Sequence, residues 1–466
     1  MKGLRSYAAT VLKHGRDIYG VKHSPLFVDA LEVSTMKAPE KMYIHRLGGP
    51  GPRSKQPFQP VISSNLAYQG NLMRFLAGLS NLTGDGRYRD AYKESLRYCF
   101  KHYAVANGLL QMGHHRWINL NTDEQDGNDW PAGKSGHEMK RDYPYYPIFW
   151  DADPVAARRM MTAHWDSHIQ DWGFMNFTRH GSYVKELNEE TVWNQPVTKP
   201  VVGIVKGNLT FFDSGSDIIY AGAQLGLLNE DDRPLFWAQR LYARYSESAH
   251  PDTGLPPWHH TSLRDFGSEE NPVPEYALIT SGSAGLMNGG GIAMLRLGEE
   301  LGAKGRYYRE TMLKHLKAYA KHCYRPEVNE MRNVLFDGTD LADRDAKNAK
   351  PGEEIKSSWT PWSPTPTNIL AFAICYKQSA DKDIWEALRA MCRGNNFGDI
   401  GNGTSKAPRL NLETEEENYL FIFPLVELFK ATRDEAYLEL GRVIACLLYT
   451  SPSPRDRTRS RMPSSA

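Results

Sequence analysis

The chain lacks any long uninterrupted apolar run and any excess of charge of one sign. No stretch approaches the roughly 20 consecutive apolar residues that a membrane-spanning helix needs, so we expect no membrane span. The 56 basic and 55 acidic residues give a formal net charge of +1. Such a balance offers no basic footprint for nucleic acid or for an anionic membrane. With 41% hydrophobic and 24% charged residues among 466, the composition is that of a globular chain with ample core.

Cysteine is scarce and is not arranged in pairs. None of the five cysteines forms a CxxC motif, and Cys99, Cys375 and Cys392 fall within apolar helical patterns. These three, together with Cys323, are expected to be buried free thiols rather than disulfides or a zinc knot. An apolar signal segment is also lacking at residues 1–6. A cytoplasmic location is the direct interpretation, and a periplasmic or secreted location is the alternative if a leader has been lost.

Residues 446–466 lack the helical pattern of the segment before them. They are rich in Ser, Pro and Arg and offer no set of apolar residues that could form a core. The segment resembles a translated sequencing adapter, so we expect it to be non-native and the natural C-terminus to be missing. Residues 1–445 are predicted to form a single domain, which we expect to be monomeric.

One structural unit recurs along the chain: an amphipathic helix, a short turn, and a second helix that returns beside the first. The predicted helix pairs cover residues 65–79 and 88–102, 218–227 and 235–246, 284–301 and 307–322, 368–376 and 384–392, and 419–429 and 436–445. A lone hairpin cannot bury its apolar face, so a series of them must stack or close on itself. We therefore predict an all-α fold, an (α/α) toroid or barrel of six or seven hairpins, with long loops that form a cleft at one end. An open α-solenoid is the structural alternative.

Long connections between these helices carry most of the chemically reactive side chains. The connections at 113–143, 179–207, 251–274 and 326–366 are longer than plain linkers in a compact chain, and such loops are usually functional. His115, Glu138 and His180 provide nitrogen and oxygen ligands of the kind that suits manganese, nickel or cobalt. Their wide separation in sequence leaves a second interpretation open, in which they are scattered polar loop residues.

Two other groups of polar residues have both a catalytic and a structural interpretation. His164 and His168 are spaced i, i+4 in a helix predicted over residues 153–172. No HExxH motif accompanies them, so packing against neighbouring helices is the favoured interpretation. Asp213 and Asp217 begin another helix, where an N-cap role explains the first of them. As a carboxylate pair they could instead serve a glycoside hydrolase.

Aromatic residues gather near the long connections. Trp258 lies in Pro-rich loop sequence, and Tyr146 lies in the segment Tyr-Pro-Tyr-Tyr-Pro at residues 143–147. Rings in such segments fit stacking platforms for sugars, and they fit core filling where loops meet helices equally well.

The sequence as a whole resembles the family 2 polysaccharide lyases, the pectate lyases built on an (α/α) barrel. The motifs that carry the resemblance are Gly-His-His-Arg at 113–116, His-Glu at 137–138 and Arg-His at 179–180. Relatives usually have Gly-Gly-His-Arg in the first motif, so His115 takes the ligand position. The resemblance extends from Asp17 to the Gly-Asp-Ile-Gly turn at 398–401.

The resemblance implies a reaction and several residue roles. His115, Glu138 and His180 would coordinate a catalytic divalent cation, commonly manganese in this family, with nickel or cobalt as alternatives. Arg179 would be the base for β-elimination on α-1,4-linked polygalacturonate or oligogalacturonate. Candidates for binding this acidic substrate are Arg116, Lys140, Tyr146, Lys206 and Trp258.

Two other functions stay open at this point. A metal-independent toroid glycoside hydrolase or sugar epimerase could act through Asp213 and Asp217, and a non-catalytic toroid could bind saccharides. Activity that survives a chelator would favour the first. Tight oligosaccharide binding without turnover would favour the second.

Overall fold

The computed structural model describes residues 1–39, 61–112, 116–127, 135–137, 145–178, 180–198, 205–206, 210–262, 290–348, 360–402 and 408–450. The chain divides into two compact units. Unit 1 comprises Met1–Ser248 with His259–Pro274, and unit 2 comprises Ala249–Trp258 with Glu275–Ala466. The single domain predicted over residues 1–445 stays a prediction.

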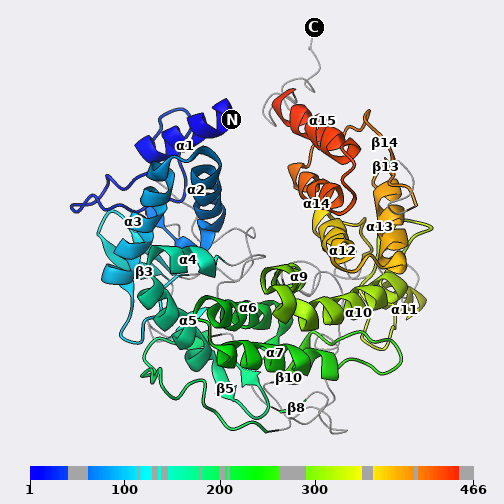
Figure 1. Ribbon diagram of the computed structural model, residues 1–466, viewed down its shortest axis with the longest axis horizontal. Helices are drawn as coiled ribbons and strands as arrows, with labels where there is room; N and C mark the ends of the chain where they lie inside the picture. The colour runs from blue at the N-terminus through cyan, green and yellow to red at the C-terminus, as the bar shows by residue number, and fades with distance from the viewer. Residues whose placement is uncertain are drawn as a thin grey trace. The chain divides into compact units, whose positions relative to one another are not determined.

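In its described part, unit 1 contains three pairs of contacting helices. The pairs are α2 (Gly70–Thr83) with α3 (Gly86–Tyr103), α4 (Tyr146–Ala152) with α5 (Pro154–His168), and α6 (Phe212–Leu228) with α7 (Asp232–Glu247), as Figure 1 shows. Helix α1 (Lys2–His14) packs on α2. Because α4 also contacts α3 and α6, and α5 contacts α6, the three pairs share one core.

Unit 2 repeats the same arrangement in its described part. The pairs are α9 (Gly290–Glu300) with α10 (Arg306–His322), α12 (Pro366–Ser379) with α13 (Lys382–Gly394), and α14 (Ile422–Thr432) with α15 (Ala436–Thr450). Helix α12 contacts α9, α10 and α14 as well, so it lies at the centre of this unit. Unit 2 also contains α11 (Leu341–Asn348), the short 3-10 helices η3 (Gly302–Gly305) and η6 (Tyr419–Phe421), and two strand pairs, β11 (Tyr324–Arg325) with β12 (Glu330–Met331), and β13 (Gly398–Asp399) with β14 (Arg409–Leu410).

The predicted fold class is confirmed. Both units are built from helices that succeed one another as hairpins of the (α/α) class, and within the described residues sheet is limited to short strands. Each of the five predicted hairpins is present among the described residues, and α4 with α5 adds a pair that the sequence pattern does not reveal. The predicted cleft concerns connections of which parts lie outside the described residues, and it stays a prediction.

The prediction of buried free thiols is also confirmed. Cys99, Cys323, Cys375 and Cys392 are free and buried in the helical core. Burial raises the pKa of Cys392 to about 12, so its thiol stays protonated at neutral pH. These residues act as small core side chains.

Helix α5 begins where the sequence predicts and ends earlier. Asp153 caps its N-terminus by accepting hydrogen bonds from two backbone N–H groups of the first turn, and Pro154 is the first helical residue. The predicted end at residue 172 is wrong, because the helix stops at His168. The β-branched Ile169 then adopts extended dihedral angles and starts a strand, and the pairing of that strand outweighs the helical pattern.

The long connections of unit 1 contain short strands that the sequence does not predict. The strand sets are β1 (Ser63–Ser64), β2 (Arg116–Asn119) and β3 (Glu124–Gly127); β4 (Ser135–His137) and β7 (His180–Ser182); β5 (Ile169–Asp171) and β6 (Asn176–Phe177); and β8 (Val205–Lys206), β10 (His259–Ser262) and β9 (Thr210–Phe211). Strands of two to four residues are too short to show an alternating pattern. They nevertheless fix where the backbone of each loop lies.

Helix α15 continues past residue 445, the last residue before the predicted non-native segment. Leu447 and Leu448 extend the helix, which ends at Thr450. The rest of the predicted non-native tail, residues 451–466, lies outside the described residues.

A buried carboxylate joins three helices of unit 2. Glu427 on α14 accepts hydrogen bonds from Lys377 on α12, Arg296 on α9 and Lys430 on its own helix. Burial raises the pKa of Glu427, but the three cations more than offset that effect and lower the pKa to about 2. A carboxylate whose folded-state pKa is depressed stabilises the fold above its unfolded pKa, and this contribution is lost as the pH falls.

We expect Glu427→Gln to lower the free energy of unfolding by about 3–5 kcal/mol at pH 7, because the variant breaks a buried ion pair. The difference from the parent chain should shrink as the pH falls from about 4.5 towards about 2. Urea unfolding at pH 7 and pH 3 measures both values. Glu310→Gln, which removes an exposed partner of Arg306, is the control and should change stability by less than about 1 kcal/mol. If the free energies of unfolding of Glu427→Gln and the parent chain differed equally at pH 7 and pH 3, the depressed pKa of Glu427 would be contradicted.

Candidate active site

Strand pairing joins two segments that contain predicted metal ligands. Strands β4 and β7 are antiparallel, with His137 opposite His180 and Gly136 opposite Gly181. His137 directly precedes Glu138 in the chain, so the residue next to one predicted ligand lies opposite another. For His180 the structure describes the backbone only. The predicted residues His115, Glu138, Lys140 and Arg179 lie outside the described residues.

The remaining predicted binding residues are spread over unit 1 and the start of unit 2. Arg116, which follows His115 in the chain, is the first residue of β2 and is buried opposite Gly127. The backbone of Lys206 pairs with that of Ser262, and Trp258 is half-buried directly before β10. Among the side chains that the structure describes, no group of three or more His, Cys, Asp or Glu is arranged to hold a metal. The three predicted ligands are not among those side chains.

The described residues on both sides of Arg179 are held against the end of α5. Before it, the N–H of Thr178 donates to the carbonyl oxygen of His168 at 2.9 Å, and Phe177 is buried. After it, Gly181 packs on the imidazole of His168 so closely that an added Cβ would lie 2.3 Å from its Cε1 atom. The segment that contains Arg179 and His180 is therefore anchored at each end.

A buried polar network lies beneath this segment. The hydroxyl of Tyr146 on α4 donates to Oδ1 of Asp217 on α6 at 2.6 Å. Nε2 of His164 on α5 lies 3.3 Å from Oδ2 of the same carboxylate. One turn further along α5, Nδ1 of His168 donates to the carbonyl oxygen of His164 at 2.7 Å. The network thus connects three helices, and the predicted core packing of the two histidines is confirmed.

This packing changes two interpretations of the sequence. Tyr146 is 2% exposed and its hydroxyl is engaged by Asp217, so the structure does not support its predicted role as a sugar-stacking platform. Burial and the nearby Asp217 carboxylate raise the pKa of Tyr146 well above its usual range, and the phenol stays protonated. Asp217 is itself buried and lies between Tyr146 and His164, which does not suit a glycosidase carboxylate that must reach substrate.

A second group of buried polar side chains was not predicted from the sequence. His259 and His260 on β10 are buried, and burial lowers the pKa of His259 to about 4. Burial and then the charge of Arg244 lower the pKa of His260 to about 3, so both imidazoles are neutral at pH 7. The ring of His260 stands perpendicular to that of Tyr245 at 4.5 Å. In the sequence these histidines follow Trp258 and look like part of an aromatic cluster, and only the β8-β10-β9 sheet reveals their burial.

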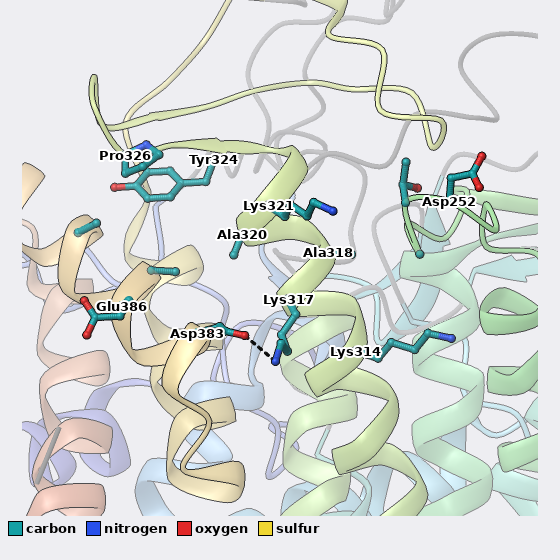
Figure 2. Close-up of a pocket in the computed structure, with 14 residues that line it drawn as sticks. Asp252, Lys314, Lys317, Ala318, Ala320, Lys321, Tyr324, Pro326, Asp383 and Glu386 are labelled. Atoms are coloured by element: carbon teal, nitrogen blue, oxygen red, sulfur yellow. Dashed lines mark ion pairs between the residues drawn. The ribbon is translucent and has the colours of Figure 1, made fainter. Parts of the chain in front are cut away.

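Unit 2 carries an open groove of about 760 Å³ between α10 and α13, shown in Figure 2. Its charged lining residues are the lysines Lys314, Lys317 and Lys321 and the carboxylates Asp252, Asp383 and Glu386. Lys317 pairs with Asp383 at 2.7 Å, the contact drawn in Figure 2. Because lysines and carboxylates are equal in number, the groove does not have the cationic character that a polyuronate would require.

Comparison with known proteins places the chain among carbohydrate-active enzymes. The family described as periplasmic pectate lyase matches residues 24–275 and 261–453. A pectate disaccharide-lyase of Dickeya dadantii (strain 3937) is 25% identical over 398 residues, which cover 76% of this chain and 68% of that protein. Among solved structures, a D-mannose isomerase gives a TM-score of 0.46 at 9% identity, over 95% of this chain and 97% of that one. A sugar epimerase from a ruminal bacterium gives 0.44 at 13% identity, over 74% and 79%.

The family match runs through both compact units and includes every motif singled out in the sequence. The chain is therefore an enzyme of the polysaccharide lyase class. It belongs to the periplasmic pectate lyase family.

We expect Tyr146→Phe to lower the free energy of unfolding by about 1–3 kcal/mol, because the buried Oδ1 of Asp217 loses its hydrogen-bond donor. Denaturant unfolding at pH 7 measures the change. Tyr7→Phe is a matched control, since Tyr7 is an exposed residue of α1, and it should change stability by less than about 0.5 kcal/mol. Equal stabilities for the two variants would show that Tyr146 does not hold Asp217.

Proposed function

We propose that this enzyme is a metal-dependent pectate lyase that cleaves α-1,4-polygalacturonate or oligogalacturonate by β-elimination. The observation that carries the proposal is the β4–β7 register, in which the residue preceding Glu138 lies opposite His180. Membership of the periplasmic pectate lyase family supports the substrate class. The similarity to a pectate disaccharide-lyase supports the same reaction.

The proposed metal ligands are His115, Glu138 and His180. Two imidazole nitrogens and one carboxylate suit a divalent transition metal, and we propose manganese, with nickel or cobalt as alternatives. The strand pairing fits this set, because it brings together two of the three segments that supply the donors. When bound, the metal would supply Lewis-acid stabilisation of the negative charge that develops beside the uronate carboxylate.

We propose Arg179 as the base. It would take the proton from C5, the carbon α to the uronate carboxylate, and the electron pair of that C–H bond would form the new C4–C5 double bond. The glycosidic C4–O bond would break with its electron pair passing to the leaving oxygen, which takes up a proton from water. An arginine must be neutral to do so, although its usual pKa is above about 12. Desolvation and a nearby cation both disfavour the charged guanidinium, which is the direction required. The alternative role is a bidentate clamp on the substrate carboxylate.

Cationic side chains are needed to hold the other uronate groups. We propose Arg116, Lys140 and Lys206 for this role, with Trp258 as a stacking surface. Arg116 has a direct link to the site, because it follows His115 in the chain and begins β2. Lys206 belongs to β8, which pairs with the strand that carries the neutral His259 and His260.

We also propose a periplasmic location and a monomeric state. The description of the family as periplasmic supports the location. Among the described helices, none combines the length and apolar character needed to cross a bilayer.

The proposal predicts that EDTA abolishes the release of products that absorb in the ultraviolet as unsaturated uronates, and that Mn²⁺ restores it. Arg179→Lys should lower kcat by about 10²–10⁴-fold, the usual contribution of a general base. His180→Ala should lose activity together with Mn²⁺ binding. Absorbance assays on polygalacturonate measure each rate.

The matched control is Arg306→Lys, because Arg306 is an exposed residue of α10 in unit 2, and its rate should equal that of the parent chain. Undiminished product release by Arg179→Lys would contradict the role as base. Turnover that persists in EDTA without ultraviolet-absorbing product would favour the metal-independent hydrolase or epimerase, and binding without turnover would favour a saccharide-binding protein.

A further inference from the structure

The backbone that carries the proposed ligand His180 rests directly on an imidazole ring. Gly181, the next residue of β7, lies so close to His168 that an added Cβ would be 2.3 Å from Cε1 and 2.6 Å from Nδ1. The hydroxyl of Ser167 would be 2.7 Å away. A side chain at position 181 would therefore push the strand away from α5. Gly181 is not among the glycines with a positive φ. Glycine is therefore required here by the lack of room for a side chain and not by the backbone conformation.

The ring that supports Gly181 is held by its own helix. Nδ1 of His168 donates to the carbonyl oxygen of His164 at 2.7 Å and lies 3.0 Å from Oγ of Ser167. His168 is also buried, and its carbonyl oxygen accepts the N–H of Thr178. The same residue therefore contacts the chain just before Arg179 and just after His180.

The helix turn that presents His168 is tied in turn to two neighbouring helices. His164 faces Asp217 of α6, and Asp217 accepts the hydroxyl of Tyr146 from α4. These side chains are buried in unit 1, and a rotation of α5 would separate the imidazole of His164 from the Asp217 carboxylate 3.3 Å away. Helix α5 cannot rotate about its axis without breaking these contacts.

We propose that His168 is a positioning residue for the metal site, which fixes β7 at Gly181 and so sets the place of His180. The residues Tyr146, Asp217 and His164 keep the His168 ring in its place. This inference rests on the proposed function, in which His180 is a ligand. Metal sites depend on such supporting contacts, because a ligand that is misplaced by about 1 Å loses much of its binding energy.

The test measures Mn²⁺ binding by the metal-free protein, with the electron paramagnetic resonance signal of free Mn²⁺ as the readout. Gly181→Ala should raise the Kd for Mn²⁺ by about 10–100-fold, the range found for residues that orient metal ligands. The matched control is Gly78→Ala on α2, where nothing lies within 4 Å of the added Cβ. Its Kd should equal that of the parent chain.

A double variant separates positioning from general loss of structure. His168→Ala removes the ring that the new Cβ would meet, and the Ser167 hydroxyl can rotate aside. Gly181→Ala should therefore cause no further loss in the His168→Ala background, and the two changes should be strongly non-additive. If each change only destabilised the protein independently, the Kd of the double variant would rise by the product of the two single increases. If Gly181→Ala yields no folded protein, His168→Ala alone decides, with the same 10–100-fold rise expected.

The outcomes distinguish this inference from the proposed function. If the parent chain binds Mn²⁺ and His180→Ala abolishes binding, but Gly181→Ala or His168→Ala leaves the Kd unchanged, the positioning role is overturned and the metal site stands. Multiplicative losses in the double variant would also overturn the positioning role. If the parent chain binds no Mn²⁺, both the proposed metal site and this inference are overturned.

Discussion

The contact between the backbone of β7 and the end of α5 is the constraint on which the candidate site depends. Two contacts of strand β7 matter for the site: β4 pairs with it along the backbone, and His168 packs against Gly181. The pairing with β4 places the segment that precedes Glu138 beside β7. The contact of Gly181 with His168 holds β7 against the end of helix α5.

The proposed positioning of β7 depends on buried polar side chains of α5 and of its neighbours α4 and α6. The Tyr146 hydroxyl donates a hydrogen bond to Asp217, and the His164 imidazole lies 3.3 Å from the same carboxylate, so a rotation of α5 would separate His164 from Asp217. This arrangement places reactive residues on connections while rigid helices determine where the connections lie. It also explains why histidines on a core helix need no catalytic or metal-binding role of their own.

Much of the fold can be predicted from the sequence, and much of the site cannot. Helical hairpins follow from apolar periodicity and from short polar turns, and the start of α5 follows from Asp153 and Pro154. The end of α5 does not, because the pairing of β5 with β6 is a tertiary interaction that overrides the local pattern. Burial of Tyr146 was likewise unpredictable, since a tyrosine among prolines looks the same at a binding surface and in a core. Gly181 resembles any loop glycine until its contact with His168 is known.

The central claim is that His115, Glu138 and His180 converge on one metal ion beside Arg179. Anomalous X-ray scattering at the manganese absorption edge, from crystals of the enzyme grown with Mn²⁺, tests it most directly. We expect an anomalous peak bound by these three side chains, with Arg179 facing the same cavity. A peak bound by other residues, or three side chains too far apart to share one ion, would contradict it.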